Sequence, residues 1–423
     1  MTLVDPLTIR LPRELLPADG RFGCGPSKVR PEQVAALSAV STTVLGTSHR
    51  QAPVKSLVGS VRAGLRELFA LPDGWEVMLG NGGSTLFWDA ATFGLIERRS
   101  QHLVFGEFSS KFATAAAAAP HISDPVVVAS APGTHPVAVV EPDVDAYALT
   151  HNETSTGVMM PLTRPSGPGG ALVLVDATSA AGGLLWDPAQ VDVYYFAPQK
   201  CFASDGGLWV AACSPAAVER IERLAASGRW VPASLDLGIA LSNSRADQTY
   251  NTPAVATLVM LDEQVRWMLA NGGLAWANAR SRRSSDTLYG WAAARSWANP
   301  FVAEAAERSQ VVGTIDLATG ADGGADAGEV CAALRANGIV DTYGTLAYET
   351  KVDCEPLTSI MAGVTYHDFE AERGSASLGD EIDIELVAKF GDHWAAGIKY
   401  ADYDGTGAFA DRQKLWLAVD FTY

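Results

Sequence analysis

The chain has 423 residues, 48% of them hydrophobic and 19% charged, and a formal net charge of −17. This composition is typical of a packed globular protein, and the length predicts two or three domains. The negative charge argues against nucleic acid and against an anionic membrane surface as partners, so any anionic substrate must be held by local cationic side chains and backbone N–H groups.

The sequence indicates neither a targeting signal nor a metal site. Its first residues, Met1-Thr-Leu-Val-Asp-Pro6, contain no basic or apolar region of a signal peptide, and no stretch has the roughly 18 apolar residues of a membrane helix. The five cysteines are scattered and form no Cys-x-x-Cys pair, which favours reduced thiols over a disulfide framework or a zinc site. We therefore expect a cytoplasmic protein without a membrane or metal partner.

Helices and strands alternate over the first half of the chain. A Pro-rich arm and a turn-rich segment precede a helix that begins near Pro31, where proline suits the first turn, and a second helix follows Thr47-Ser-His-Arg50. Apolar runs predict strands, several followed by a helix, at 75–79, 103–105, 125–129, 146–149, 171–176, 191–200 and 207–212. This alternation predicts the α/β fold class, with a mostly parallel, doubly wound sheet that has helices on both faces.

The second half of the chain begins with a mainly helical region. It contains a helix over 216–227, the polar loop Gln248-Thr-Tyr-Asn-Thr-Pro253 and two long helices separated by Asn271-Gly-Gly273. A small α+β segment follows, with a strand over 311–317 and a helix over 327–337. We predict three domains: a large domain over 1–275, a truncated small domain over 276–342 and a tail over 343–423.

Two of the predicted strands lead to a charged residue, Asp176 in one case and Lys200 in the other. Ligands of open α/β folds collect at the carboxyl edge of the sheet, where both residues are expected. The residues after Lys200 are mostly small, so its amine should be partly desolvated and nucleophilic. A pyridoxal-phosphate enzyme needs such a lysine together with an aspartate that faces the pyridine nitrogen. The alternative is a structural ion pair at the strand ends.

Two further segments have the composition of anion-binding sites. The glycine-rich Gly80-Asn-Gly-Gly-Ser-Thr85 lies between a strand and a helix, where backbone N–H groups and the helix N-terminus can hold a phosphate, although plain tight turns also use glycine. Thr47-Ser-His-Arg50 is either a polar helix start or a pair of cationic groups that reaches for an anion. The residues by themselves favour the helix start.

Residues 21–342, about three quarters of the chain, resemble the phosphoserine aminotransferase family, which has the fold-type-I, class V pyridoxal-phosphate fold. The motifs that carry this resemblance occur in order: Phe22-Gly-Cys-Gly-Pro26, Thr47-Ser-His-Arg50, Gly80-Asn-Gly-Gly-Ser-Thr85, Phe105-Gly-Glu-Phe-Ser109, His151-Asn-Glu-Thr154, Val175-Asp-Ala-Thr178, Ala197-Pro-Gln-Lys200, Gln248-Thr-Tyr-Asn-Thr252 and Arg335-Ala-Asn-Gly-Ile-Val-Asp-Thr342. The resemblance implies a mostly parallel seven-stranded sheet and a small α+β domain.

The resemblance also implies roles for single residues. Lys200 would be the Schiff-base lysine and the base that moves the substrate proton, and Asp176 would keep the pyridine nitrogen protonated. Phe108 would stack on the cofactor ring. Further cofactor contacts are implied for Gly83, Ser84, Thr85, Thr154 and Gln199.

Other motif residues would act on the substrate or across a subunit boundary. Asn251 and Thr252 would reach the cofactor phosphate of the neighbouring subunit, which implies a homodimer. His49 and Arg50 would hold the substrate's phosphate or distal carboxylate, and this replaces the interpretation as a helix start. The implied reaction exchanges an amino group between glutamate and 3-phosphohydroxypyruvate and gives 2-oxoglutarate and O-phosphoserine.

The tail over 343–423 departs from the family. Apolar and polar residues alternate over 381–390, 393–400 and 414–423, and this segment resembles the C-terminal strands of an outer-membrane porin of the alginate-export type. About four such strands are too few for a porin, so we interpret the tail as a foreign fusion; an antiparallel meander packed on the enzyme is the alternative.

The tail also lacks a substrate-binding arginine that the family has in this region, since only Arg373 and Arg412 occur beyond Thr342. We therefore expect cofactor binding with weak or absent transamination. Two other functions remain open. One is a different class V enzyme, of the alanine–glyoxylate aminotransferase or cysteine desulfurase type, and the other is a catalytically inactive chimera.

Overall fold

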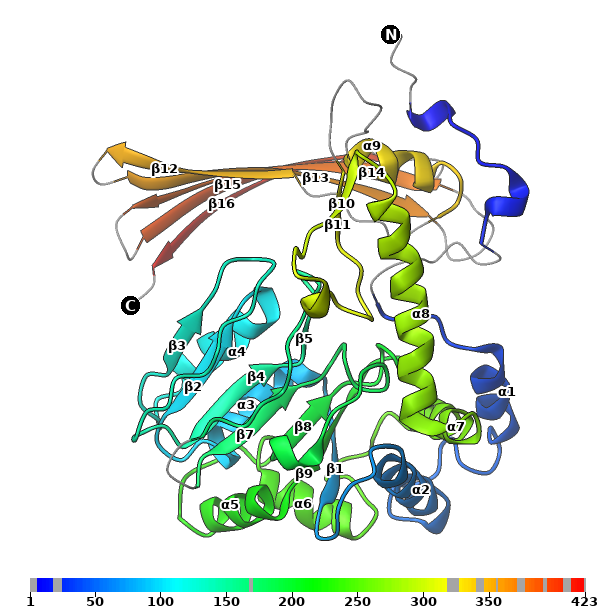
Figure 1. The fold of residues 1–423 in the computed structure, drawn as a ribbon, viewed down its shortest axis with the longest axis vertical. Helices are drawn as coiled ribbons and strands as arrows, with labels where there is room; N and C mark the ends of the chain where they lie inside the picture. Colours follow the sequence, from blue (N-terminus) through cyan, green and yellow to red (C-terminus); the bar gives the residue numbers. More distant parts are fainter. Residues whose placement is uncertain are drawn as a thin grey trace. The chain divides into compact units, whose positions relative to one another are not determined.

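The structure, a computed structural model, describes residues 6–17, 25–166, 170–317, 327–339, 346–354, 357–370, 377–390, 394–405 and 412–421 (Figure 1). The chain divides into two compact units, one over Gly23–Gly324 and the other over Met1–Phe22 with Ala325–Tyr423. The motif residues Phe22, Gly23 and Cys24 and the tail residue Arg373 lie outside the described residues. The predicted domain boundaries stay predictions.

A seven-stranded sheet forms the centre of the larger unit, in the order β1-β9-β8-β7-β4-β2-β3 (Figure 1). Its strands are β1 (Glu76–Asn81), β2 (Ser100–Val104), β3 (Val126–Ala129), β4 (Ala146–Thr150), β7 (Leu172–Asp176), β8 (Val193–Phe196) and β9 (Leu208–Cys213). Only β9 runs against its neighbours, and the other pairs are parallel. The prediction of a mostly parallel seven-stranded sheet is confirmed, and the carboxyl ends of six strands therefore share one edge.

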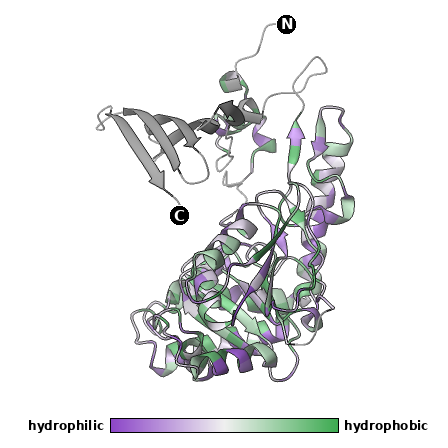
Figure 2. Cartoon of the chain, turned by 90° about the vertical axis from the view of Figure 1, so that its left-hand side faces the viewer, coloured by the Kyte–Doolittle hydropathy of each residue, from purple (hydrophilic) through white to green (hydrophobic). Residues whose placement is uncertain are grey.

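The described residues of the larger unit contain eight α-helices. They are α1 (Pro31–Ala39), α2 (Ala52–Leu68), α3 (Ser84–Gly94), α4 (Glu107–Ala117), α5 (Pro215–Ala225), α6 (Leu237–Arg245), α7 (Val255–Ala270) and α8 (Gly273–Ala293). Helices α2 and α7 pack on one face of the sheet and α3 to α6 on the other, while α1 and α8 pack on α7. The sequence did not predict α6. The helices carry apolar and polar residues side by side, as expected for elements with one buried face (Figure 2).

Two apolar clusters form the core, one on each face of the sheet. Along β8, Tyr194 and Phe196 belong to the cluster with α2 and α7, while Val193 and Tyr195 belong to the cluster with α3 to α6. Successive side chains of a strand point to opposite faces, so a strand between two clusters must be apolar throughout. This is why continuous apolar runs predicted the central strands correctly.

The break between α7 and α8 lies at the predicted glycines. Gly272 and Gly273 have φ values of +112° and +68°, a region that only glycine adopts without strain. The shorter elements are the hairpin of β5 (Asn152–Glu153) and β6 (Val158–Met159), the pair of β10 (Ala298–Pro300) and β11 (Ile315–Leu317), and the short helices η3 (Pro188–Gln190) and η4 (Ala305–Glu307). Of these, only β11 was predicted, and the predicted strand over 311–317 is too long, because only its last three residues pair as a strand.

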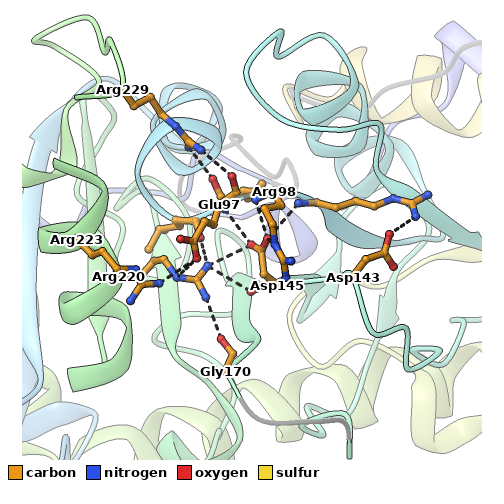
Figure 3. A network of polar contacts seen from close by, with 11 residues as sticks. Glu97, Arg98, Asp143, Asp145, Gly170, Arg220, Arg223 and Arg229 are labelled. Carbon is orange, nitrogen blue, oxygen red and sulfur yellow. Dashed lines mark hydrogen bonds and ion pairs between the residues drawn. The ribbon is translucent and has the colours of Figure 1, made fainter. Parts of the chain in front are cut away.

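A buried charge network lies at the amino-terminal edge of the sheet, opposite the edge described above (Figure 3). Asp145, directly before β4, accepts hydrogen bonds from the backbone N–H groups of Glu97 (2.9 Å) and Arg98 (2.7 Å) and from the Arg220 guanidinium (3.2 Å). Arg220 is only 5% exposed and also donates to the carbonyl of Gly170 at 2.9 Å. The network ties α5 to the loops before β2 and β4.

The smaller unit contains η1 (Pro6–Thr8), η2 (Arg13–Leu15), α9 (Ala327–Arg335) and a five-stranded sheet. The strands pair in chain order and antiparallel; they are β12 (Leu346–Cys354), β13 (Leu357–Glu370), β14 (Ser377–Phe390), β15 (Trp394–Gly405) and β16 (Arg412–Phe421). Strands β14, β15 and β16 include the described residues of the three segments with the predicted strand alternation. The resemblance of the tail to a porin stays a prediction. Among the described helices, none combines the length and apolar character that crossing a membrane requires.

Candidate active site

The predicted site residues gather at the carboxyl edge of the large sheet. Asp176 is the last residue of β7, and Lys200 lies in the loop after β8. The loop after β1 leads into α3 and brings Ser84 to the same edge, where its hydroxyl contacts the hydroxyl of Thr178 just beyond Asp176. This is the edge at which open α/β sheets bind ligands.

Gly25 lies directly against the side chain of Lys200. A Cβ atom on Gly25 would be 2.6 Å from Lys200 Cδ and 2.8 Å from its Nζ, and the φ of Gly25 is +125°. A side chain at this position would displace the end of the Lys200 side chain, and the positive φ strains any residue other than glycine. The Ser27 N–H donates to the Gln199 carbonyl at 2.7 Å and fixes this segment beside the lysine. The role of this glycine was not predicted.

Asp176 is buried, with 6% of its surface exposed, and three hydrogen bonds hold its carboxyl group. Thr178 donates its N–H (2.9 Å) and its hydroxyl (2.6 Å) to Oδ1, and Trp88 donates its indole N–H to Oδ2 at 2.9 Å. Burial raises the pKa of Asp176, and the bonds from Thr178 and Trp88 oppose that rise. Within the described residues no ion pair joins this carboxyl to a cation. A cationic ligand atom, such as a protonated pyridine nitrogen, fits beside it.

The turn between β1 and α3 leaves space for an anion. Gly82 has a φ of +102°, and Gly83 precedes α3 without a side-chain cap on the helix N-terminus. Nothing lies within 4 Å of where a Cβ of Gly83 would be. The hydroxyls of Ser84 and Thr178 lie 2.6 Å apart; because Thr178 donates its single hydroxyl proton to Asp176 Oδ1, Ser84 donates to Thr178 Oγ1, and Thr85 is exposed. The predicted phosphate cradle is thus open and joined to the Asp176 group.

Polar groups without partners line the loops after β4 and β8. The hydroxyl of Thr154 and the amide of Asn152 both donate to Ser179 Oγ, at 3.0 Å and 2.9 Å. The carbonyl oxygens of the Asn152 and Gln199 side chains are buried and accept no hydrogen bond within the described residues. Such acceptors are costly unless a donor reaches them, so they fit a ligand with hydroxyl or N–H groups.

Phe108 lies in the first turn of α4, and its ring is 36% exposed. Glu153 holds this helix start, since its carboxylate accepts the N–H groups of Phe108 (3.4 Å) and Ser109 (2.9 Å) although the residue is fully buried. The exposed ring can stack on a planar ligand. Glu153 had no predicted role beyond its motif.

The predicted substrate residues His49 and Arg50 have different surroundings. His49 Nδ1 lies 3.2 Å from the hydroxyl of Thr252, and its buried Nε2 has no partner within the described residues. The amide of Asn81, the last residue of β1, donates to the Thr252 carbonyl at 2.9 Å. Arg50 instead lines a separate cleft of about 900 Å³, and Asn251 is exposed.

Cys201 follows the lysine directly but is a poor nucleophile. Burial raises the pKa of its thiol to about 12, an effect that the neighbouring Lys200 only partly opposes. The thiol contacts the Ser179 carbonyl at 3.4 Å. A cysteine desulfurase needs a reactive thiolate, so this residue does not favour that alternative.

Sequence reasoning missed Trp88, the side-chain donor to Asp176. Trp88 is four residues after Ser84 on α3, and residues at this spacing share one face of a helix. That spacing was the available signal, because the predicted cradle at Ser84 fixed which face of α3 points to the site.

The chain is similar in sequence and in fold to known proteins. A family model described as class V aminotransferase matches residues 134–339. The phosphoserine aminotransferase of a Nocardioides species is 61% identical over 336 residues, which are 79% of this chain and 89% of that protein. The phosphoserine aminotransferase of Rhodococcus opacus is 59% identical over 332 residues, or 78% and 88% of the two chains. The crystal structure of the Cytophaga hutchinsonii phosphoserine aminotransferase superposes with a TM-score of 0.65 at 25% identity and covers 69% of this chain and 82% of that chain.

Proposed function

The chain belongs to the phosphoserine aminotransferase family, and we propose that it transfers an amino group between glutamate and 3-phosphohydroxypyruvate with pyridoxal 5′-phosphate as its cofactor. The products are 2-oxoglutarate and O-phosphoserine. The single observation that carries this proposal is the buried Asp176 carboxyl, which shares one sheet edge with Lys200 and has no cationic partner within the described residues. That arrangement suits a ring whose nitrogen must stay protonated.

When bound, the cofactor supplies an electron sink for the substrate carbanion. Lys200 would hold the cofactor covalently and then move the proton at the substrate Cα, and Asp176 would keep the positive charge on the ring nitrogen. Phe108 would cover one face of the ring. The remaining cofactor contacts in the proposal are Gly83, Ser84, Thr85, Thr154 and Gln199.

Substrate binding is proposed to involve His49 and Arg50. The free Nε2 of His49 is placed to donate to an oxyanion when Nδ1 accepts the Thr252 hydroxyl. We further propose a cytoplasmic homodimer in which Asn251 and Thr252 act at the neighbouring subunit's site.

The sequence of the tail leads to a further proposal about the rate of transamination. The family's carboxylate-binding arginine has no counterpart in the tail sequence, and we propose that residues 343–423 add no porin function. Loss of a bidentate arginine from a carboxylate substrate costs a few kcal/mol, or about 10²-fold in kcat/KM. We therefore propose normal cofactor binding with slow transamination.

The test is a visible absorbance spectrum of purified protein with pyridoxal phosphate, followed by glutamate turnover coupled to 3-phosphohydroxypyruvate. Lys200→Ala is the control for covalent cofactor binding. Cofactor absorbance that requires Lys200, together with O-phosphoserine formation, supports the proposal.

Faster turnover of alanine with glyoxylate, or sulfur release from cysteine, would assign the chain to another class V activity. A spectrum without bound cofactor would leave the inactive chimera as the better description. Turnover at the rate of a family member would overturn only the proposed impairment.

A further inference from the structure

The indole of Trp88 connects the core of the protein to the carboxyl group of Asp176. Trp88 lies on α3, is 4% exposed, and its Nε1 donates to Asp176 Oδ2 at 2.9 Å. Its ring packs among apolar residues and stacks with Phe112 at a centroid distance of 6.3 Å. The orientation of the N–H group is therefore fixed by packing, and with it the position of the oxygen that accepts the bond.

The acceptor positions of Asp176 leave room for one more donor. A carboxylate accepts about four hydrogen bonds, two on each oxygen. Both positions on Oδ1 are taken by Thr178, and Trp88 takes one on Oδ2. The remaining position on Oδ2 is the one available to a ring nitrogen. Since Trp88 fixes Oδ2, it also fixes the direction in which that last position points.

From this geometry we infer that Trp88 is a positioning residue that aims Asp176 Oδ2 at the cofactor's ring nitrogen and keeps its carboxyl group ionised. The inference rests on the proposed function, because it presupposes a cofactor beside Asp176. A hydrogen bond to the charged form of a carboxyl favours that form, which burial at this position otherwise opposes.

A second buried polar group near Asp176, the hydroxyl of Tyr195, is a reason why the donor at Oδ2 matters. Tyr195 on β8 is fully buried, and burial together with the nearby Asp176 carboxylate raises the pKa of its hydroxyl well above the usual range. The ring of Phe87, on the same helix as Trp88, stacks on Tyr195 with a centroid distance of 4.4 Å. Without the indole N–H at Oδ2, the Tyr195 hydroxyl beside Asp176 is a donor that could take its place and turn the carboxyl group.

The simpler explanation is that Trp88 is a core residue whose N–H merely finds a partner. Trp88→Phe separates the two roles, because it keeps an aromatic ring in the core and removes only the donor. Phe112→Leu is the matched control, since it disturbs the same apolar cluster without a polar contact to Asp176. Trp88→His tests rescue, because a smaller ring that still has an N–H donor can restore the bond.

The readout is the pH titration of the bound cofactor's absorbance, with the cofactor dissociation constant as a second measurement. The nitrogen that joins Lys200 to the bound cofactor is the group that titrates, and a positive charge on the ring nitrogen favours loss of its proton. If Asp176 stabilises that ring charge less well, the proton is lost only at higher pH. We expect Trp88→Phe to move the titration upward by about one pH unit and to weaken cofactor binding about tenfold, while Phe112→Leu leaves the titration in place. We expect Trp88→His to reverse at least half of the shift.

Each outcome decides between the two roles. A titration of Trp88→Phe that coincides with wild type would overturn the inference, even if the variant is less stable. If Trp88→Phe does not fold, Trp88→Leu replaces it, because it too lacks the N–H donor, and an unmoved titration would have the same meaning. A wild-type protein that binds no cofactor would refute the proposed function instead, and this is seen before any variant is made.

Discussion

His49 and Thr252, which are far apart in the sequence, lie with Nδ1 and Oγ1 3.2 Å apart in one chain. The family resemblance gives these residues different duties, since His49 would bind substrate and Thr252 would bind the neighbouring subunit's cofactor phosphate. In the proposed homodimer, this contact would place both residues on one anion-binding surface at the neighbouring subunit's site.

This arrangement predicts complementation between two inactive variants. Lys200→Ala removes the catalytic amine of its own chain, while Thr252→Ala damages the site that Thr252 serves. If Thr252 serves the partner, a mixed dimer has one intact site, so random mixing should restore roughly a quarter of wild-type activity. The measurement is turnover after the two purified variants are unfolded and refolded together. If activity stays at the level of the separately refolded variants, Thr252 acts in its own chain.

Because Gly25 lies against Lys200, we expect a single methyl group added at position 25 to impair cofactor binding and catalysis. Gly25→Ala places a Cβ 2.6 Å from Lys200 Cδ, so the lysine must move or the loop must open. We expect at least a tenfold loss of cofactor affinity and of kcat.

Gly46→Ala is the control for the backbone effect of this substitution. Gly46 also has a positive φ, +73°, but nothing lies within 4 Å of its virtual Cβ. Its alanine variant should lose roughly 1 kcal/mol of stability and keep the cofactor spectrum. Equal effects of the two substitutions on cofactor affinity would mean that strain, and not contact with Lys200, explains the role of Gly25.

Asp176 and Lys200 could be predicted from the sequence because each follows an apolar run, and a strand buried on both faces leaves a local pattern. The break at Gly272 and Gly273 was predictable for the same reason, since the backbone conformation there depends on the glycines themselves.

Glu153 and Asp145 could not be assigned in this way, and for Trp88 the only signal was its spacing from Ser84 on α3. Each acts on a partner that only the tertiary fold brings near, as with Trp88 and Asp176 or Asp145 and Arg220. Their residue types have no periodic pattern and are compatible with ordinary core or surface positions. Strands of two or three residues, such as β5 and β10, are likewise too short to show a period.

The buried pair of Asp145 and Arg220 predicts a large effect on stability away from the active site. Arg220→Met leaves the Asp145 carboxylate buried without its closest cation, and we expect a loss of about 3 kcal/mol in the free energy of unfolding. Arg223→Met is the matched control, because Arg223 is half-exposed and its ion pair with Glu97 should contribute less than about 1 kcal/mol. Urea denaturation followed by circular dichroism measures both. A loss below 1 kcal/mol for Arg220→Met would mean that the backbone N–H groups alone stabilise Asp145.

The buried imidazole of His102 predicts how stability depends on pH. Burial lowers the pKa of His102 to about 3, so the folded protein keeps this ring neutral, while the unfolded chain binds a proton below about pH 6.5. The unfolded state therefore holds more protons between these values, and stability must fall as the pH falls through this window. Between pH 5.5 and 4.5, with one proton involved, the contribution is about 1.4 kcal/mol per pH unit.

Replacement of this ring should remove that contribution. We expect His102→Asn to lower the slope of the unfolding free energy against pH by about 1.4 kcal/mol per unit, measured by urea denaturation at one protein concentration. Ser100→Ala serves as the control, because it removes the 2.9 Å hydrogen bond to His102 Nε2 and keeps the titrating ring. Its curve should run close to parallel with that of wild type. A His102→Asn curve that is also parallel would mean that the ring is protonated in the folded state, or that local opening exposes it to water at low pH.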